Sequence, residues 1–519
     1  MLARLDGTPW DLVVIGGGAT GLGVAIESCS RGYRTALLEQ SDFAKGTSSR
    51  STKLVHGGVR YLQQGNVSLV LEALRERALL RQNAPHLVSD LRFIVPNYDW
   101  WEAPFYGIGL KLYDILAGRH GFGRSRALSK EETLEHLPTI ETDGLRGGTL
   151  YYDGQFDDAR LAIAMALTVS DLGGTLLNYF EVVGLVKQEG VVRGVEARDV
   201  ESGRQFVLEA KVVVNATGPF TDSVRRMDDP QAGRMIRPSQ GVHIVLDRSF
   251  LPGDSVHGDS AILVPHTDDG RVLFAIPWHD RVVVGTTDTP VDDIDLEPRA
   301  KPEEVDFLLE HCARYLTKDP RPEDVLSVFA GIRPLVGDPD QQDSSAISRD
   351  HTLHISTSCL VTIAGGKWTT YRKMAEDTVD QASVLAGLEE RPCVTRALHL
   401  HGYHQDAQSY GELAPYGSDA VAVRDVLRAH PGGERRLHPR LRAREGEIRW
   451  AVEEEMARTI EDFLARRTRS LMLDARASIE AAPRTAELMA EFLGYDEAWA
   501  REQVKTYTDL AAGYLLVPV

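Results

Sequence analysis

The first forty residues follow the apolar and polar pattern of a strand, a helix and a second strand. Residues 12–15 (LVVI) and 35–38 (TALL) are short apolar runs typical of buried strands. Between them, a glycine-rich turn leads into a segment with apolar residues at helical spacing. The pattern predicts a βαβ unit.

Three glycines of this turn have the spacing of a dinucleotide-binding motif. Gly16, Gly18 and Gly21 match G-x-G-x-x-G, in which the glycines permit a tight turn, close approach of a pyrophosphate and packing of helix on strand. Glu39 ends the second strand, where a carboxylate can accept hydrogen bonds from ribose hydroxyls. The alternative is a turn in some other α/β protein, but strand, spacing and acid together favour an adenine dinucleotide.

Two later segments indicate that this dinucleotide is FAD. Residues 174–222 predict a strand, a meander with turns at Gly190 and 202–203, and a buried strand that ends in Ala216-Thr217-Gly218, a sequence that closes over the dinucleotide in flavoproteins. Residues 359–382 predict a strand, a Gly-Gly turn and a helix whose positive end can face the flavin. The predicted fold is α/β, a two-dinucleotide-binding-domain flavoprotein with a Rossmann-like FAD domain.

The stretch GTSSRSTKLVHGGVRYL, residues 46–62, is rich in hydroxyl groups. Its Ser and Thr side chains can complete an anion site at a helix start, and Gly57 and Gly58 let the backbone approach a flat ring. A hydroxyl-rich surface loop is the alternative.

Alternating strand patterns continue from about residue 231 to 333, with a hairpin expected at DDG, residues 268–270. They predict an antiparallel-sheet substrate domain over the flavin. From about residue 408 helical periodicity dominates and predicts a C-terminal all-helical domain. One buried helical face is expected there, formed by Ile448, Val452, Met456, Ile460 and Phe463.

Composition narrows the function. The chain has 519 residues and a formal net charge of -18, which argues against nucleic-acid binding and requires a local basic cluster for any anionic substrate. Four separated cysteines fit a reducing, cytoplasmic compartment, and neither a signal peptide nor a spanning helix is expected. We expect no metal, because no acid or cysteine accompanies His399, His401 and His404, and residues 338–343 lack the pattern of a calcium loop.

Five blocks identify a family: TSSRSTKLVHGGVRYLQ, AGIRPLV, ISRDHTL, AGGKWTTYRKMAE and EEEMARTIEDFLARRTRSLMLDA. With them the chain resembles the FAD-dependent, quinone-linked glycerol-3-phosphate dehydrogenases. The resemblance implies oxidation of sn-glycerol 3-phosphate to dihydroxyacetone phosphate, with hydride transfer to FAD N5 and electrons passed to a membrane quinone. It also implies a cationic pocket for the substrate, formed by Arg60, Arg333, Arg349 and Lys367, with Tyr61 and His243 as further donors.

The base that takes the alcohol proton stays unassigned between His56 and His243, with His56 preferred because it is expected near the flavin. Arg333 or Lys367 can instead stabilise the alkoxide. By resemblance and motif the FAD-binding residues are Gly16, Gly18, Gly21, Glu39, Gln40, Thr47, Ser48, Ser49, Thr52, Lys53, His56, Gly57, Gly58, Val182, Ala216, Thr217, Gly218, Gly331, Gly366, Lys367, Trp368 and Thr369.

The expected domains are an FAD-dependent oxidoreductase region over 1–387, a linker over 388–407 and the helical domain over 408–519. Within the first, FAD-binding segments cover about 10–90, 174–222 and 330–387, and substrate segments about 91–173 and 223–330.

Residues 104–126 have the composition of an interfacial helix, with Pro104 first and Phe105, Ile108, Leu112 and Leu116 on one face. An ordinary core helix with a basic end explains the pattern equally well. The family resemblance favours peripheral attachment to the inner face of the cytoplasmic membrane, and a homodimer.

Three alternatives remain. The chain could be a glycerol-3-phosphate oxidase that uses oxygen, or an amino-acid oxidase of the same fold, although the cationic cluster exceeds what one carboxylate needs. A non-catalytic flavin-binding scaffold is the third alternative.

Overall fold

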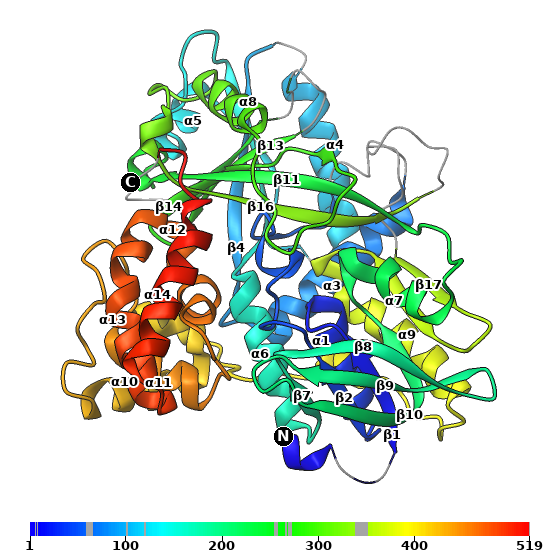
Figure 1. Cartoon of the computed structure of the whole chain (residues 1–519). Helices are drawn as coiled ribbons and strands as arrows, with labels where there is room; N and C mark the ends of the chain where they lie inside the picture. Colours follow the sequence, from blue (N-terminus) through cyan, green and yellow to red (C-terminus); the bar gives the residue numbers. More distant parts are fainter. Residues whose placement is uncertain are drawn as a thin grey trace.

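The structure is a computed structural model of the chain (Figure 1). It describes all residues except 6, 8, 59–65, 100–101, 119–120, 254–257, 265–266, 268–271, 338–350 and 518–519, and within one helix the side chains of 102–106 and 108 are not described.

The first layer is a mainly parallel sheet with the order β17-β18-β10-β1-β2-β7. Its strands are β1 (Trp10–Ile15), β2 (Thr35–Leu38), β7 (Thr175–Leu177), β10 (Gln205–Asn215) and β18 (Val361–Gly365), with β17 (His351–Ile355) antiparallel at the edge. Strands β8 (Phe180–Gln188) and β9 (Val191–Asp199) form the predicted meander onto β10. The apolar runs of β1 and β2 are continuous because both faces of a parallel sheet are covered.

Three helices pack against this sheet. They are α1 (Ala19–Ser30), α6 (Asp158–Asp171) and α9 (Tyr371–Leu385), which share one hydrophobic core with the strands. Helix α6 belongs to this core, although the expected boundaries assign 91–173 to the substrate segment. The predicted βαβ unit and the Rossmann-like domain are confirmed.

The second layer is a larger sheet that lies above the first in Figure 1. The region predicted to be antiparallel supplies β11 (Ile236–Asp247), β12 (Ser260–Val264), β13 (Leu273–Trp278), β14 (Arg281–Gly285), β15 (Thr289–Pro290) and β16 (Val325–Val336). The sheet also contains four earlier strands that were not predicted as strands, namely β3 (Leu54–Val55), β4 (Val88–Asn97), β5 (Arg126–Leu128) and β6 (Gly147–Phe156). Strands β5 and β6 and most of β4 lie in the substrate segment expected at 91–173. Strands β4 and β12 pair in parallel, so the sheet is mixed. The predicted DDG hairpin lies outside the described residues, but β12 and β13 pair antiparallel as expected.

The other α-helices in the described part of the first 400 residues are α3 (Val67–Asn83), α4 (Glu102–Ala117), α5 (Lys130–His136), α7 (Thr221–Asp228) and α8 (Pro302–Ala313). The expected linker contacts the first layer: the Leu400 N–H donates to the Asn83 carbonyl, and the Thr395 hydroxyl donates to buried Glu27.

The C-terminal helices are η9 (Ala407–Asp419), α10 (Ala420–Ala429), α11 (Glu445–Glu453), η10 (Asp462–Arg467), α12 (Ser470–Leu473), α13 (Ala475–Leu493) and α14 (Glu497–Ala512). Their core includes Val245, Trp278 and Phe329 of the second sheet, so these helices pack on that sheet. In Figure 1 they lie beside both layers.

The prediction of a single helical face from residue 448 to residue 463 is wrong in one respect. Ile448, Ile460 and Phe463 are fully buried, but α11 ends at Glu453 and Phe463 lies in a separate π-helical turn. The break occurs where Met456 takes a left-handed φ of 57° and the Asp462 carboxylate accepts the N–H groups of Arg458 and Thr459. A buried acid thus starts a new turn, which apolar periodicity cannot reveal.

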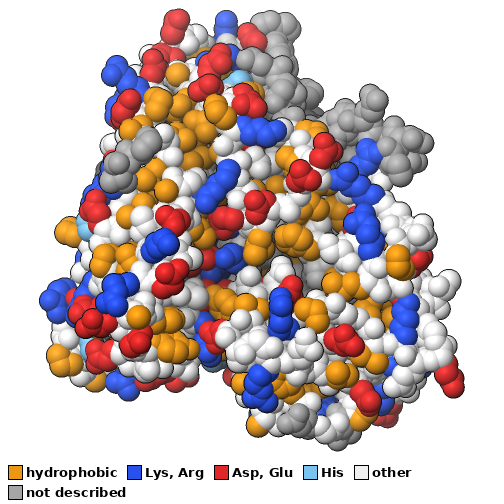
Figure 2. Space-filling model, in the orientation of Figure 1, with side chains coloured by type: hydrophobic (Ala, Val, Ile, Leu, Met, Phe, Trp, Pro, Cys, Tyr) orange, Lys and Arg blue, Asp and Glu red, His pale blue; other side chains and the backbone are white. Residues whose placement is uncertain are grey.

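Helix α4 begins at Glu102, so Pro104 is its third residue and not its first. Leu110 and Tyr113 are buried, whereas Leu112 and Ile115 are 44% and 74% exposed. Of the predicted face, Leu116 is partly buried, and the side chains of 105 and 108 lie outside the described set. Within the described part of the chain, every helix is too short or too polar to span a bilayer. Figure 2 shows acidic and basic side chains interspersed over one face of the molecule, with apolar side chains between them.

Candidate functional site

Four parallel strands, β1, β2, β10 and β18, bring distant segments together at one edge of the first sheet. Ile15 at the end of β1 lies opposite Leu38 of β2 and Asn215 of β10. Asn215 in turn lies opposite Thr362 of β18. Because the carboxyl ends of these strands share an edge, the segments that begin at residues 16, 39, 216 and 365 converge there, at the place where α/β sheets bind ligands.

The glycine turn fits the pyrophosphate of an adenine dinucleotide. Gly16 has a φ of +107°, and a Cβ there would lie 2.7 Å from the Ala216 carbonyl oxygen. A Cβ on Gly21 would lie 1.9 Å from the Gly16 oxygen. Gly18 is the N-cap residue of α1 and has no side chain to cover the helix start, so the positive end of the helix can face an anion.

Glu39 stands at the carboxyl end of β2, as the motif predicts. Its two oxygens accept the N–H groups of Gly17, at 2.6 Å, and Ser41, at 2.9 Å. Burial raises the pKa of Glu39, and these two hydrogen bonds oppose the rise. Each oxygen keeps a lone pair for a ribose hydroxyl. Gln40, predicted to bind the cofactor, is exposed.

The segment after β2 is held by specific partners and is not a free surface loop. The Ser48 hydroxyl accepts the Ala19 N–H at 2.9 Å, and the Ser48 carbonyl accepts the Trp368 indole N–H. The Thr47 hydroxyl donates to the Ile332 carbonyl on β16. We call residues 39–53, between β2 and β3, the cofactor loop.

The flavin-side residues of the sequence prediction meet around the start of α9. The His56 N–H donates to the Thr369 hydroxyl at 3.3 Å, and the Gly57 N–H donates to the Tyr113 hydroxyl at 3.0 Å. A Cβ on Gly57 would lie 2.3 Å from that oxygen, so only glycine fits. Gly58 and Gly366 have left-handed φ values of 76° and 71°. The remaining predicted residues of this turn are Lys367, which precedes η7 (Trp368–Thr370), and Trp368, whose ring packs against Phe156.

One face of the second sheet is directed at the cofactor loop. Antiparallel register places Gly241 opposite Gly331 and His243 opposite Phe329, so these residues share a face. A Cβ on Gly331 would lie 3.0 Å from the Arg50 Cβ of the loop. The Thr52 hydroxyl lies 3.0 Å from His243 Nε2. The glycines therefore make room for close contact between sheet and loop.

Arg333 and His243 belong to this same face. Ser239 pairs with Arg333, and a Cβ on Gly241 would lie 2.5 Å from the Arg333 guanidinium. Asp288 accepts from Arg333 at 3.1 Å, and Thr286 accepts at 3.0 Å, so the guanidinium is oriented.

His243 is 2% exposed and stacks on the Phe329 ring at 4.8 Å. Burial lowers the pKa of His243 well below its ordinary value, and the charges of Lys53 and Arg333 lower it further. The ring is therefore neutral near pH 7. Its Nδ1 has no hydrogen-bond partner among the described residues.

Lys53 was predicted to bind the cofactor, and its ammonium group is committed to protein partners. It is fully buried and donates to Asp158 at 2.7 Å and to the Ser49 carbonyl at 2.8 Å. Burial lowers the pKa of Lys53 to about 7, although Asp158 opposes the shift. Arg469 also donates a hydrogen bond to Asp158. Sequence reasoning predicted neither Asp158 nor Arg469 at the site. The only signal for Arg469 was the arginine-rich block RRTR in an otherwise apolar stretch.

The other predicted site residues lie at the convergent edge of the first sheet, in the core of the meander, or outside the described residues. Ala216, Thr217 and Gly218 follow β10 at the convergent edge, and the Thr217 hydroxyl donates to Asn215. Val182 is buried in the core of the meander. Arg60, Tyr61 and Arg349 lie outside the described residues.

Comparison with known proteins places this geometry in a family. Residues 11–372 match the family described as FAD dependent oxidoreductase, and residues 361–500 match the C-terminal domain of alpha-glycerophosphate oxidase. The mitochondrial glycerol-3-phosphate dehydrogenase of Homo sapiens is 44% identical over 98% of this chain and 74% of that protein. A mitochondrial glycerol-3-phosphate dehydrogenase of Arabidopsis thaliana is 40% identical over 97% of this chain and 86% of that protein.

The solved structures agree with the sequence comparisons. The glycerol-3-phosphate dehydrogenase of Bacillus halodurans complexed with FAD has a TM-score of 0.80 and 30% identity, and covers 100% of this chain and 98% of that chain. Glycine oxidase from Geobacillus kaustophilus, with a TM-score of 0.55 and 19% identity over 76% of this chain and 98% of that chain, shares the fold alone.

Proposed function

Because the chain belongs to the FAD-dependent glycerol-3-phosphate dehydrogenases, we propose that it oxidises sn-glycerol 3-phosphate to dihydroxyacetone phosphate. The observation that carries this proposal is the sheet face on which an oriented arginine, Arg333, and a neutral histidine, His243, are directed at the cofactor loop. A phosphorylated alcohol needs both groups, a cation for its phosphate and a base for its hydroxyl.

Arg333 is the described residue best prepared to bind the phosphate. Asp288 and Thr286 hold its guanidinium in one orientation, so little side-chain entropy is lost when the phosphate binds. Lys367, beside the flavin turn, supplies a second cation. By resemblance Arg60 and Arg349 complete the pocket, with Tyr61 as a further donor.

For the base we propose His243, whose buried ring lies on the same sheet face as Arg333, in place of His56. A buried imidazole that stays neutral can accept the proton of the C2 hydroxyl without first losing its own. The Thr52 hydroxyl, bonded to Nε2, orients the ring. Bound FAD supplies the hydride acceptor, and the protein aligns substrate and ring system through the turns at 56–58 and 365–369.

For the electron acceptor we propose a membrane quinone, reached by peripheral attachment of a homodimer to the inner face of the cytoplasmic membrane. The exposed Leu112 and Ile115 on α4, with exposed Lys111 beside them, support contact with lipid. Oxygen is the rival acceptor, favoured by the match of residues 361–500 to a glycerophosphate oxidase domain.

Anaerobic reduction of the flavin tests the proposal. The purified holoenzyme is mixed with sn-glycerol 3-phosphate or, in parallel, with glycerol, and the flavin absorbance is followed. We expect bleaching by the phosphorylated alcohol alone, reversed rapidly by a quinone analogue and slowly by air. Fast recovery in air would identify an oxidase, and no bleaching by glycerol 3-phosphate would contradict the assigned substrate.

A further inference from the structure

Buried polar groups of the cofactor loop form hydrogen bonds with arginines of the C-terminal helices. These contacts join residues more than 400 positions apart in the sequence. We propose that Arg466, Arg467 and Arg469 are positioning residues for FAD, which fix the cofactor loop in its binding conformation and touch the cofactor only through it.

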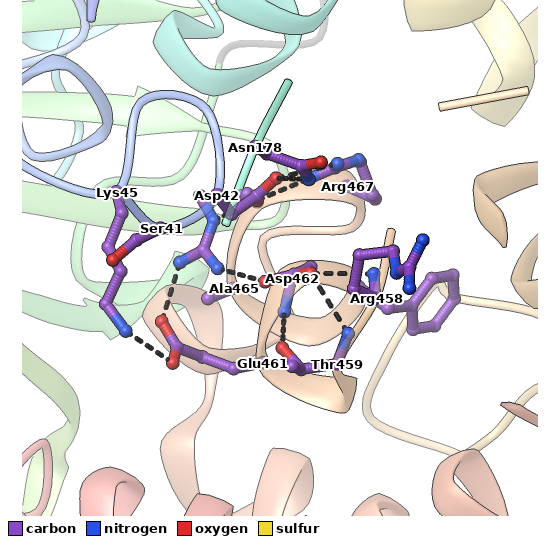
Figure 3. Close-up of polar contacts among 12 residues, drawn as sticks. Ser41, Asp42, Lys45, Asn178, Arg458, Thr459, Glu461, Asp462, Ala465 and Arg467 are labelled. Carbon is purple, nitrogen blue, oxygen red and sulfur yellow. Dashed lines mark hydrogen bonds and ion pairs between the residues drawn. The ribbon is translucent and has the colours of Figure 1, made fainter. Parts of the chain in front are cut away.

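The first anchor is Asp42, three residues after Glu39 (Figure 3). Arg467 donates to its two oxygens at 2.6 and 2.9 Å in a bidentate pair, and Arg466 Nε donates to one of the same oxygens. The side chains of Asp42 and Arg467 are both fully buried. Burial by itself raises the pKa of Asp42, but the charges of Arg467 and Arg466 outweigh it and hold that pKa at about 2.

The two arginines are held from the other side by the C-terminal helices. Arg466 donates to Glu461 and Asp462, each at 2.7 Å, and Arg467 donates to the Glu455 carbonyl. Glu461 also pairs with Lys45 of the cofactor loop at 2.8 Å (Figure 3). The anchor is therefore a network of acidic and basic side chains, which links the cofactor loop to the π-helical turn η10.

The second anchor lies at the other end of the loop. Arg469 donates to the Ser49 carbonyl at 2.8 Å and to Asp158 at 2.9 Å. Ser49 follows Ser48, whose hydroxyl accepts the first N–H of α1, so Arg469 fixes the strip of backbone beside the pyrophosphate turn. Thr47 and Ser48, two of the predicted cofactor contacts, lie between the two anchors, and Glu39 lies three residues before the first.

Arginine is required at these positions because its planar guanidinium group can donate to two acceptors at fixed angles. Lysine keeps the charge but cannot form the bidentate pair, and its ammonium is costly to bury. Replacing Arg467 with lysine should therefore loosen the loop without leaving Asp42 opposite a neutral group.

The test compares Arg467→Lys with a matched control, Arg160→Lys. Arg160 is also buried and forms a bidentate pair with Glu455 at 2.8 and 2.7 Å, which joins α6 to the C-terminal part of the chain without a direct bond to Asp42. Because Glu455 also contacts Arg467, the control includes any effect that reaches the loop through Glu455. Release of FAD from diluted full-length holoenzyme is followed by the fluorescence of free FAD. We expect the FAD dissociation constant of Arg467→Lys to rise about tenfold or more, and that of Arg160→Lys to change less than about threefold, while both lower Tm.

Two further readouts separate positioning from general stability. At saturating FAD the kcat of Arg467→Lys should return towards that of the wild type. If Arg467→Lys does not fold, Asp42→Asn, which keeps an acceptor of the same shape, is judged by the same criterion against Arg160→Lys. Equal weakening of FAD binding in the test and control variants would overturn the proposal.

Hydrogen exchange of the unmodified chain gives an independent result. Coupling between two sites is reciprocal, so removal of FAD should speed amide exchange in residues 462–469 as well as in the cofactor loop. Faster exchange in the loop with unchanged exchange in 462–469 would contradict the proposed coupling.

Discussion

His243 illustrates how single side chains acquire their chemistry from neighbours on other elements. It comes from β11, Lys53 from the cofactor loop and Arg333 from β16. Burial and these two cations oppose protonation of the ring, and Lys53 itself has a pKa lowered to about 7. The result is a neutral base beside a cation, which is the pairing that oxidation of a phosphorylated alcohol requires.

The lowered pKa of His243 predicts an unusual pH profile. A histidine with an ordinary pKa would lose its base form as the pH falls through about 6.5. Since the pKa of His243 is well below that value, protonation of its ring should not lower kcat at saturating substrate from about pH 8 down to about pH 6. Lys53, whose pKa is about 7, gains its charge in this range and opposes protonation of the ring further. A fall in kcat with a midpoint near pH 6.5 would instead favour a base with an ordinary pKa. The His243→Asn variant, which lacks the base, should lose activity by about a hundredfold or more.

Arg333 is predicted to affect substrate binding and not cofactor binding. In Arg333→Lys the charge remains, but the fork that Asp288 and Thr286 orient is lost. We expect KM for glycerol 3-phosphate to rise about tenfold to a hundredfold, with unchanged flavin content. Steady-state kinetics and the ratio of flavin to protein absorbance measure the two effects, and loss of flavin in this variant would show that the arginine supports the cofactor instead.

At the scale of elements, the β1–α1 turn permits the helix to begin close to the strand. The turn places the Gly21 Cα against the Gly16 carbonyl group. A side chain on residue 21 would have to displace this backbone carbonyl, which costs more free energy than the shift of a flexible side chain. Helix α4 shows the opposite case, because a Cβ on Gly109 would meet no described atom within 4 Å.

Two alanine substitutions test this contrast. Gly21→Ala should destabilise the protein by at least ~2 kcal/mol and weaken FAD retention, because the new methyl group would overlap the Gly16 oxygen. Gly109→Ala should stabilise it by up to about 1 kcal/mol, since alanine is the better helix former. Thermal unfolding compares the two, and a tolerated Gly21→Ala would mean that the turn is looser than the structure indicates.

At the scale of the whole molecule, a histidine forms a bridge between helix α6 and the segment before helix α10. His401 Nδ1 lies 2.7 Å from Asp171 at the end of α6, and its Nε2 lies 2.8 Å from Asp419 before α10. The hydrogen bond to Asp419 and that to Asp171 raise the pKa of His401 to about 9, although burial opposes them. The bridge therefore joins the FAD-binding layer to the C-terminal helices through a charged ring.

The raised pKa makes this contribution pH-dependent. Because the folded pKa exceeds the unfolded one, the stabilisation is fully present below about pH 6.5 and is lost as the pH rises through about 9. Because solvent screens this partly exposed pair, His401→Gln should lower stability by only about 1 kcal/mol at pH 6 and by little at pH 10. His399→Gln, in the same segment with its ring stacked on Tyr403, is the control. A deficit of the same size at both pH values would rule out the charged bridge.

Local patterns were sufficient to predict the elements around the cofactor. The βαβ unit, the meander with its glycine turns and the strand before Gly365 are recognisable because periodicity and turn residues act over a few positions. The glycine spacing and Glu39 likewise predicted the dinucleotide edge. The roles of Arg333 and Lys367 came from family resemblance and remain predictions.

The tertiary structure decided what lies together across long distances. Periodicity predicted burial of Ile448 and Phe463 but not the break between them, since a buried acid, Asp462, begins the new turn. Nothing local assigns β3 to β6 to the second sheet, and nothing local pairs Asp42 with Arg467, 425 residues later. Apolar patterning determines which faces are buried, because the hydrophobic effect is non-directional. Which buried charges meet depends on how the finished layers pack, because an ion pair forms only where both partners reach the same place.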